Sequence, residues 1–197
     1  MGEVQPGQRV GEVTASQTQR VDAQCYRAHA APPLGSLVRM GSPPIYAVVM
    51  EIRHEPLDPT RPLAARGADL ETEDELYAAN PQLSAILATR FTAAIVGYRD
   101  DDGIRAGLPS LPPDLHSFVF LCDAGDVAGF GGDFGWLKLL LEVRSPASDT
   151  AIAKLLRQAS NSRTDSRSFL VGAGKALAAE LSREPQRMRA LLREVGG

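Results

Sequence analysis

The chain has 197 residues, of which 44% are hydrophobic and 23% are charged, and its formal net charge is −3. This composition supports a sizeable core and excludes a globally disordered chain. The longest apolar run, residues 45–50, has the length of a strand and falls far short of the roughly 18 residues that a membrane-spanning helix needs. We therefore expect no membrane insertion.

The N-terminal part of the chain has features of a β-rich unit. Residues 1–8 contain Pro6 and two glycines and are predicted to be a flexible N-terminus that lacks the pattern of a secretory signal. Residues 45–53 are dense in apolar and β-branched side chains, which favours a central strand covered on both faces. Alternation or β-branched composition predicts further strands at residues 10–16, 21–25, 37–40, 90–99 and 117–121.

A helical insert is predicted between the fourth and fifth strands, at about residues 70–88. Thr72 and Glu75 form a capping-box pattern, which indicates that a helix starts there. Asn80 followed by Pro81 is predicted to end this helix and to cap a second one.

Residues 123–197 are predicted to form a helical C-terminal region. Several glycines between residues 125 and 135 indicate a loop that acts as a hinge. Helices are expected at residues 134–143, after Asp149, and twice more towards the end of the chain. The last two are predicted to place apolar side chains on one face, namely Leu170, Ala173, Leu177 and Leu181, and then Met188, Leu191, Leu192 and Val195.

The order of these segments resembles the HAS-barrel family, which is named for HerA-type ATPases and the rotary ATP synthase. As a whole, the chain resembles a stand-alone, mainly cyanobacterial type. The similar pieces are residues 10–13, 34–38, 45–52 and 91–98, Leu111-Pro112-Pro113 with His116, and the tail 169–192. The resemblance implies an α+β fold in which a small six-stranded antiparallel β-barrel with a helical insert, residues 9–122, precedes the helical region. In the ATPases, such a barrel resembles a collar that joins subunits or docks a partner.

The ATPases hydrolyse ATP in a separate P-loop domain, and in this respect the chain differs from them. Residues 172–176 read Gly-Ala-Gly-Lys-Ala. A Walker A loop needs a glycine five residues before its last glycine, and Ser or Thr after the lysine. Those positions hold Phe169 and Ala176, so we predict a helix with two small residues at a packing contact. The resemblance therefore implies a barrel without a motor of its own.

The sequence predicts no catalytic, cofactor or metal site. His29, His54 and His116 are isolated, with no second ligand at a metal-binding spacing. Residues 129–135 lack the GxGxxG spacing of a dinucleotide loop. Cys25 and Cys122 belong to no CxxC motif, and we expect two buried free thiols in a reducing cytoplasm.

Two sets of residues leave alternatives open. Residues 151–197 hold nine basic and four acidic side chains, a net charge of +5, so residues 1–150 carry −8. The basic set includes two i,i+4 pairs that favour a solvated helix face, with contact to nucleic-acid phosphates as the alternative: Arg183 with Arg187, and Arg189 with Arg193. Phe134 and Trp136 favour core packing, with docking of a partner as the alternative.

The leading hypothesis is a cytoplasmic, non-catalytic adaptor or assembly protein that makes protein contacts through its barrel. Its partner would be a HerA-like or other P-loop ATPase, or a second copy of the chain. The alternative is a nucleic-acid-binding module that uses the basic C-terminal helices. A small-molecule hydrolase or lyase ranks last, because it needs an acid–base pair that the sequence does not show.

Overall fold

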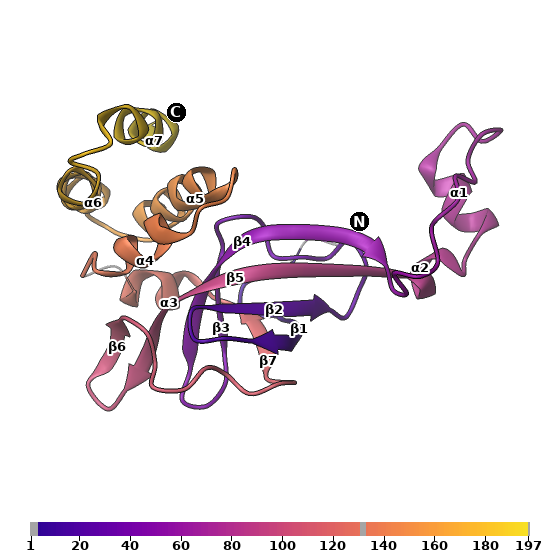
Figure 1. Cartoon of the computed structure of the whole chain (residues 1–197), viewed down its shortest axis with the longest axis horizontal. Coiled ribbons are helices and arrows are strands. Elements are labelled where there is room, and N and C mark those ends of the chain that lie inside the picture. Colours follow the sequence, from indigo (N-terminus) through magenta and orange to yellow (C-terminus); the bar gives the residue numbers. More distant parts are fainter. Residues whose placement is uncertain (1–3, 131–132, 197) are drawn as a thin grey trace.

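The computed structural model describes residues 4–130 and 133–196 (Figure 1). The strands are β1 (Arg9–Ser16), β2 (Arg20–Cys25), β3 (Leu37–Met40), β4 (Ile45–Pro56), β5 (Leu87–Asp100), β6 (Gly103–Ala106) and β7 (Phe118–Leu121). The helices are α1 (Glu73–Ala79), α2 (Leu83–Ile86), α3 (Ala124–Gly129), α4 (Trp136–Glu142), α5 (Ser148–Asn161), α6 (Ser166–Glu180) and α7 (Pro185–Gly196).

Six strands close into an antiparallel barrel, which confirms the predicted α+β fold class. The strand order is β2-β1-β7-β3-β4-β5, and the pairing of β2 with β5 closes the ring. A seventh strand, β6, extends the end of β5 as a hairpin. Register shifts in the β4–β5 ladder add the curvature that closure requires. Gly11 permits the close approach of β1 to β2, since a Cβ there would lie 2.1 Å from the carbonyl oxygen of Gln24.

The alternation along β4 separates two cores. Ile45, Ala47 and Val49 point into the barrel, whereas Tyr46, Val48 and Met50 belong to the core between the barrel and the helices. All six side chains are buried, which confirms the predicted central strand covered on both faces. Cys25 and Cys122 are buried free thiols, as predicted.

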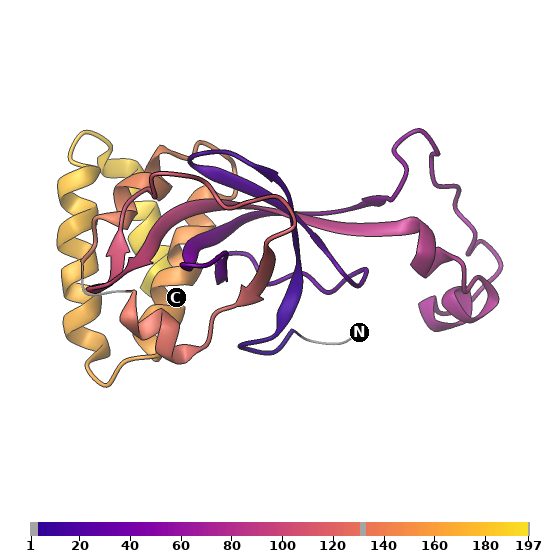
Figure 2. The same ribbon diagram turned by 90° about the horizontal axis from the view of Figure 1, so that it is seen from below.

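The C-terminal helices pack on the outer face of the barrel. Trp136, Leu137 and Leu140 of α4 join the core formed by β3, β4 and β5, and α5 adds Ile152 and Leu156. Helices α6 and α7 lie farther out, packed against α5 (Figure 2). Within the described residues, no helix combines the length and the apolar character that crossing a membrane requires.

The insert projects from the opposite end of the barrel (Figure 2). Strands β4 and β5 continue as a two-stranded arm beyond Gln24, the last β2 residue in register with β5. The arm ends at the pair Pro56–Leu87 and carries α1 and α2 at its tip. Thr72 caps α1 as predicted, because its side chain accepts a hydrogen bond from the backbone N–H of Glu75.

Several predictions of local structure were wrong. Asn80 is the C-cap of α1 and not the N-cap of α2, whose N-cap is Gln82. Leu170 is exposed, because Phe169 occupies the buried position of that turn of α6. The sequence also missed β6 and α3, both of which are short.

Parts of two other predictions fall outside the described residues. Gly131 and Gly132 of the predicted hinge do so, and so do residues 1–3 of the predicted flexible N-terminus. The rest of that N-terminus is tied to β7, since Gly7 donates to the carbonyl of Leu121 and Gln8 accepts from its N–H.

Candidate protein-docking face

The helices leave the outer face of β1 and β7 uncovered, and aromatic and arginine side chains gather there. Phe118 and Phe120 point outward from β7, while Val119 and Leu121 between and beyond them point into the barrel. This alternation follows directly from the period of two along a strand. We call the outward set, with its neighbours on adjacent elements, the aromatic–arginine face: Arg9, Tyr26, Arg39, Phe118 and Phe120.

Arg9 is the centre of this face. Its guanidinium carbon lies 4.5 Å from the centroid of the Phe118 ring and 5.2 Å from that of Tyr26. Both rings remain about half exposed, at 46% for Phe118 and 49% for Tyr26. Arg39 repeats the arrangement over Phe120, at 5.0 Å, and its Nε donates to Asp126. Stacking of this kind holds each cation in place while it stays accessible.

A hydrogen-bonded network borders the Arg9 cluster. The Tyr26 hydroxyl donates to Oε1 of Glu12 at 2.8 Å, and Nδ1 of His116 lies 3.0 Å from Oε2. Hydrogen bonds from His116 and Tyr26 lower the pKa of Glu12, so its carboxylate stays ionised. Partial burial and the bond to Glu12 raise the pKa of Tyr26. The network fixes the orientation of the Tyr26 ring next to Arg9.

His116 is isolated in the sequence, but in the fold it lies beside Glu12. The His116 side chain faces open solvent. Its side chain is 82% exposed and its backbone is left-handed, with φ of 63°. Its backbone N–H donates to the carbonyl of Val13, which anchors the loop before β7 to β1. Leu115 next to it is 59% exposed and extends the apolar surface of the face.

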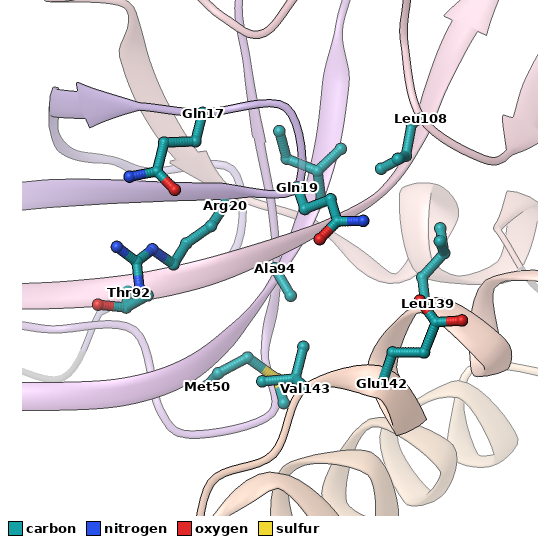
Figure 3. Close-up of a pocket in the computed structure, with 11 residues that line it drawn as sticks. Gln17, Gln19, Arg20, Met50, Thr92, Ala94, Leu108, Leu139, Glu142 and Val143 are labelled. Carbon is teal, nitrogen blue, oxygen red and sulfur yellow. The ribbon is translucent and has the colours of Figure 1, made fainter.

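A cleft of about 240 Å³ opens beside the barrel, between β2 and α4. Figure 3 shows that its lining side chains come from the β1–β2 turn, the barrel strands and α4. Met50, Ala94 and Val143 contribute apolar surface, whereas Gln19 and Glu142 are polar. Of the lining residues that the structure describes, Glu142 is the acidic one, so the cleft brings no acid–base pair together.

The four arginines for which nucleic-acid contact was the alternative to a solvated helix face have different surroundings. Arg187 is largely buried and ion-paired: its Nη2 lies 2.8 Å from Oδ1 of Asp149, and its Nε donates to both carboxylate oxygens. Arg183, Arg189 and Arg193 are exposed. Arg189 and Arg193 share an open hollow on α7. The four side chains therefore do not act as one phosphate-binding row.

Phe134 and Trp136 lie in the core between the barrel and the helices, which is the packing that the sequence favoured over docking of a partner. Trp136 has no exposed surface, and its ring lies 5.5 Å from that of Phe130. Phe134 is partly buried and packs on Phe169. Trp136 is thus a core residue and offers no surface to a partner. The Gly172 segment, similar to a P-loop, lies inside α6 and contacts the Phe134 ring, which matches the predicted packing contact.

His29 and His54, which are isolated in the sequence, come together in the fold. Their ring centroids are 4.8 Å apart. The buried hydroxyl of Thr89 accepts from the backbone N–H of His29 at 2.7 Å and lies 2.9 Å from Nδ1 of His54. Nε2 of His29 lies 3.0 Å from the hydroxyl of Tyr77 in α1, so this cluster ties the insert to the barrel.

Among residues 4–130 and 133–196, no three His, Cys, Asp or Glu side chains gather closely enough to hold a metal ion. No family model matches the chain, and no curated protein matches it.

Proposed function

We propose that the chain is a non-catalytic adaptor that binds a protein partner through the aromatic–arginine face of its barrel. The observation that carries the proposal is the Arg9 guanidinium held between the half-exposed rings of Tyr26 and Phe118. A few residues supply most of the binding energy at a protein interface, and tyrosine and arginine are enriched among them. Their fixed orientation lowers the entropy lost on association.

The resemblance to the barrels of HerA-type and rotary ATPases favours a P-loop ATPase as the partner. That partner would supply ATP hydrolysis, and the barrel would supply a docking surface. The position of the helices supports a docking role for β1 and β7, because the helices cover β4 and β5 and leave β1 and β7 free to contact a partner.

The test compares capture of a partner by the wild-type chain and by variants of the face. The purified chain is immobilised and exposed to nuclease-treated lysate of its native host, and the recovered ATPase is then purified and titrated directly. We expect Phe118→Ala and Arg9→Lys each to weaken binding by roughly tenfold, since lysine keeps the charge but loses the planar stack. Leu170→Ala is the control, because that side chain is exposed on α6, away from the face.

Equal binding by the Phe118→Ala variant and the wild type would contradict the proposed face. ATP hydrolysis by the purified chain itself would contradict the non-catalytic role. The alternative of a nucleic-acid-binding module rests on the exposed Arg189 and Arg193 on α7. It would be favoured if recovery required intact nucleic acid and Arg189→Glu with Arg193→Glu abolished it.

A further inference from the structure

The two ends of the molecule carry opposite charge. The insert, residues 57–86, holds six acidic and two basic side chains, a net charge of −4, and residues 151–197 carry +5. Figure 2 shows the insert at one end of the long axis and α6 and α7 at the other. Two surfaces of opposite sign thus point away from one another.

The charges at each end are exposed and available. Asp69, Glu71, Glu73, Asp74 and Glu75 are all exposed, and within the described residues none of them forms an ion pair. At the other end, the exposed Arg183, Arg189 and Arg193 form none within the same part of the chain. These acidic and basic side chains are therefore not neutralised inside the molecule and remain available to attract one another between molecules.

Both ends also expose large apolar side chains. Leu57, Leu63 and Ile86 are between 38% and 48% exposed and surround a hollow of about 400 Å³ in the insert. On the helical end, Val171 of α6 is 52% exposed. Leu192 of α7 is 40% exposed and lines a hollow together with Arg189 and Arg193. Apolar residues rimmed by charge are the usual composition of a protein contact.

The insert does not reach the helices of its own chain. The ladder between β4 and β5 holds it on a stiff arm, and the contact between Tyr77 and His29 fixes it at the far end of the barrel. The acidic end can meet a basic end of this kind only on another molecule.

We propose that copies of this chain associate head to tail, with the acidic insert of one copy docked on the basic α6–α7 end of the next. Such a contact joins two different surfaces, so it generates rings or linear chains of copies. The inference extends the protein-contact role proposed above by naming a second copy as a partner. It uses surfaces separate from the aromatic–arginine face.

The test is a charge swap followed by sedimentation at low and high salt. Wild type is expected to form assemblies that grow with concentration at low salt and dissociate at high salt, because exposed charges are screened. Asp69→Lys with Glu71→Lys raises the net charge of the insert from −4 to 0, and Arg189→Glu with Arg193→Glu lowers that of residues 151–197 from +5 to +1, so each pair of substitutions weakens the attraction between the two ends. Each double variant alone is expected to bind itself at least about tenfold more weakly. Asp69 and Glu71 precede α1, so their reversal leaves the Thr72 cap in place.

Mixing the two double variants is the decisive step. In the mixture the lysines introduced at positions 69 and 71 of one variant meet the glutamates introduced at positions 189 and 193 of the other, and the unchanged insert and α7 end also meet, so assembly returns. Combining all four substitutions in one chain also restores it. Asp101→Lys with Asp114→Lys, on exposed positions of the barrel unit, is the control and leaves assembly unchanged.

Two results would overturn the inference: a wild type that stays monomeric at low salt, or charge-swapped variants that do not rescue one another. Binding of single-stranded DNA that is lost only in the Arg189→Glu, Arg193→Glu variant, without self-association, would assign the α7 end to nucleic acid. Phe118→Ala, which tests the partner face, is expected to leave head-to-tail assembly intact, so either proposal can fail alone.

Discussion

Arg187 of α7 and Asp149 of α5 form a bidentate ion pair that holds α7 against α5. Nε of Arg187 lies 3.0 Å from both carboxylate oxygens, and Nη2 lies 2.8 Å from Oδ1. The hydrogen bond to Asp149 raises the pKa of Arg187 further. The Arg187 side chain is 19% exposed, so the pair is partly shielded from water.

Removal of this ion pair is expected to loosen α7. Arg187→Ala leaves the Asp149 carboxylate without its main partner and should lower the free energy of unfolding by about 1–2 kcal/mol. Arg189→Ala, on the exposed face of the same helix, is the matched control and should change it by less than about 0.5 kcal/mol. Urea unfolding, followed by the fluorescence of the single tryptophan Trp136, measures both values. Equal effects of the two substitutions would contradict the role assigned to Arg187.

The two glycines of the Gly172-Ala173-Gly174 segment should respond in opposite ways to alanine. A Cβ at Gly172 would lie 2.7 Å from the Phe134 ring, whereas a Cβ at Gly174 would meet no atom within 4 Å. Gly174→Ala should therefore stabilise the chain by about 0.5–1 kcal/mol, because alanine favours the helix. At Gly172 the contact with Phe134 should cancel or reverse this gain. Thermal unfolding of the two variants distinguishes them, and identical shifts would contradict the packing role of Gly172.

The parts of the fold that follow from local patterns were predictable. Side chains alternate in polarity along the barrel strands because every second one points into the barrel. The Thr72 cap depends only on the four consecutive residues 72–75. Helix α3 was missed because Gly125 and Gly129 suggested a loop, although Asp123 caps the helix by accepting from Asp126. Strand β6 was missed because it is a short extension of a turn.

The residues of the candidate face could not be assembled from the sequence. Arg9 reaches Phe118 only because β1 pairs with β7, strands that are more than 100 residues apart in the chain. The partner of Arg187 is also distant in the sequence, since Asp149 lies 38 residues before it and on another helix. A pattern of i,i+4 arginines gives the spacing along one helix, but it does not say which of them an acid from another helix will neutralise.

The two buried thiols predict a loss of stability in alkali. Burial raises the pKa of Cys25 to about 12 from an ordinary value of 9.0, and it raises the pKa of Cys122 as well. The unfolded chain therefore releases these protons at a lower pH than the folded chain does. The contribution of the buried thiols to the free energy of unfolding is therefore fully present below about pH 9, the pKa of an unfolded cysteine. It is lost as the pH rises from there towards the pKa of the folded state. Cys25→Ala should make the free energy of unfolding depend less on pH in this range, and an unchanged slope would contradict the prediction.

Thr89 should be a sensitive point for the attachment of the insert. Thr89 as a whole is 1% exposed. Its hydroxyl accepts from the N–H of His29, which leaves the hydroxyl proton for Nδ1 of His54. Thr89→Val keeps the shape but leaves the His29 N–H without its partner, and this should cost about 1–3 kcal/mol. Thr14→Val is the control, because it makes the same change of side chain in a strand, at a site where the hydroxyl is exposed.

The loss at Thr89 should be concentrated in the insert. His29 also holds Tyr77, so a displaced His29 removes the contact between the barrel and α1. Amide exchange should therefore accelerate in α1 and at the arm more than in β1 or β7, which do not contact Thr89 in the barrel ladder. Uniform acceleration across the barrel would indicate that Thr89 supports the whole fold and that the histidine cluster does not act as the specific anchor of the insert.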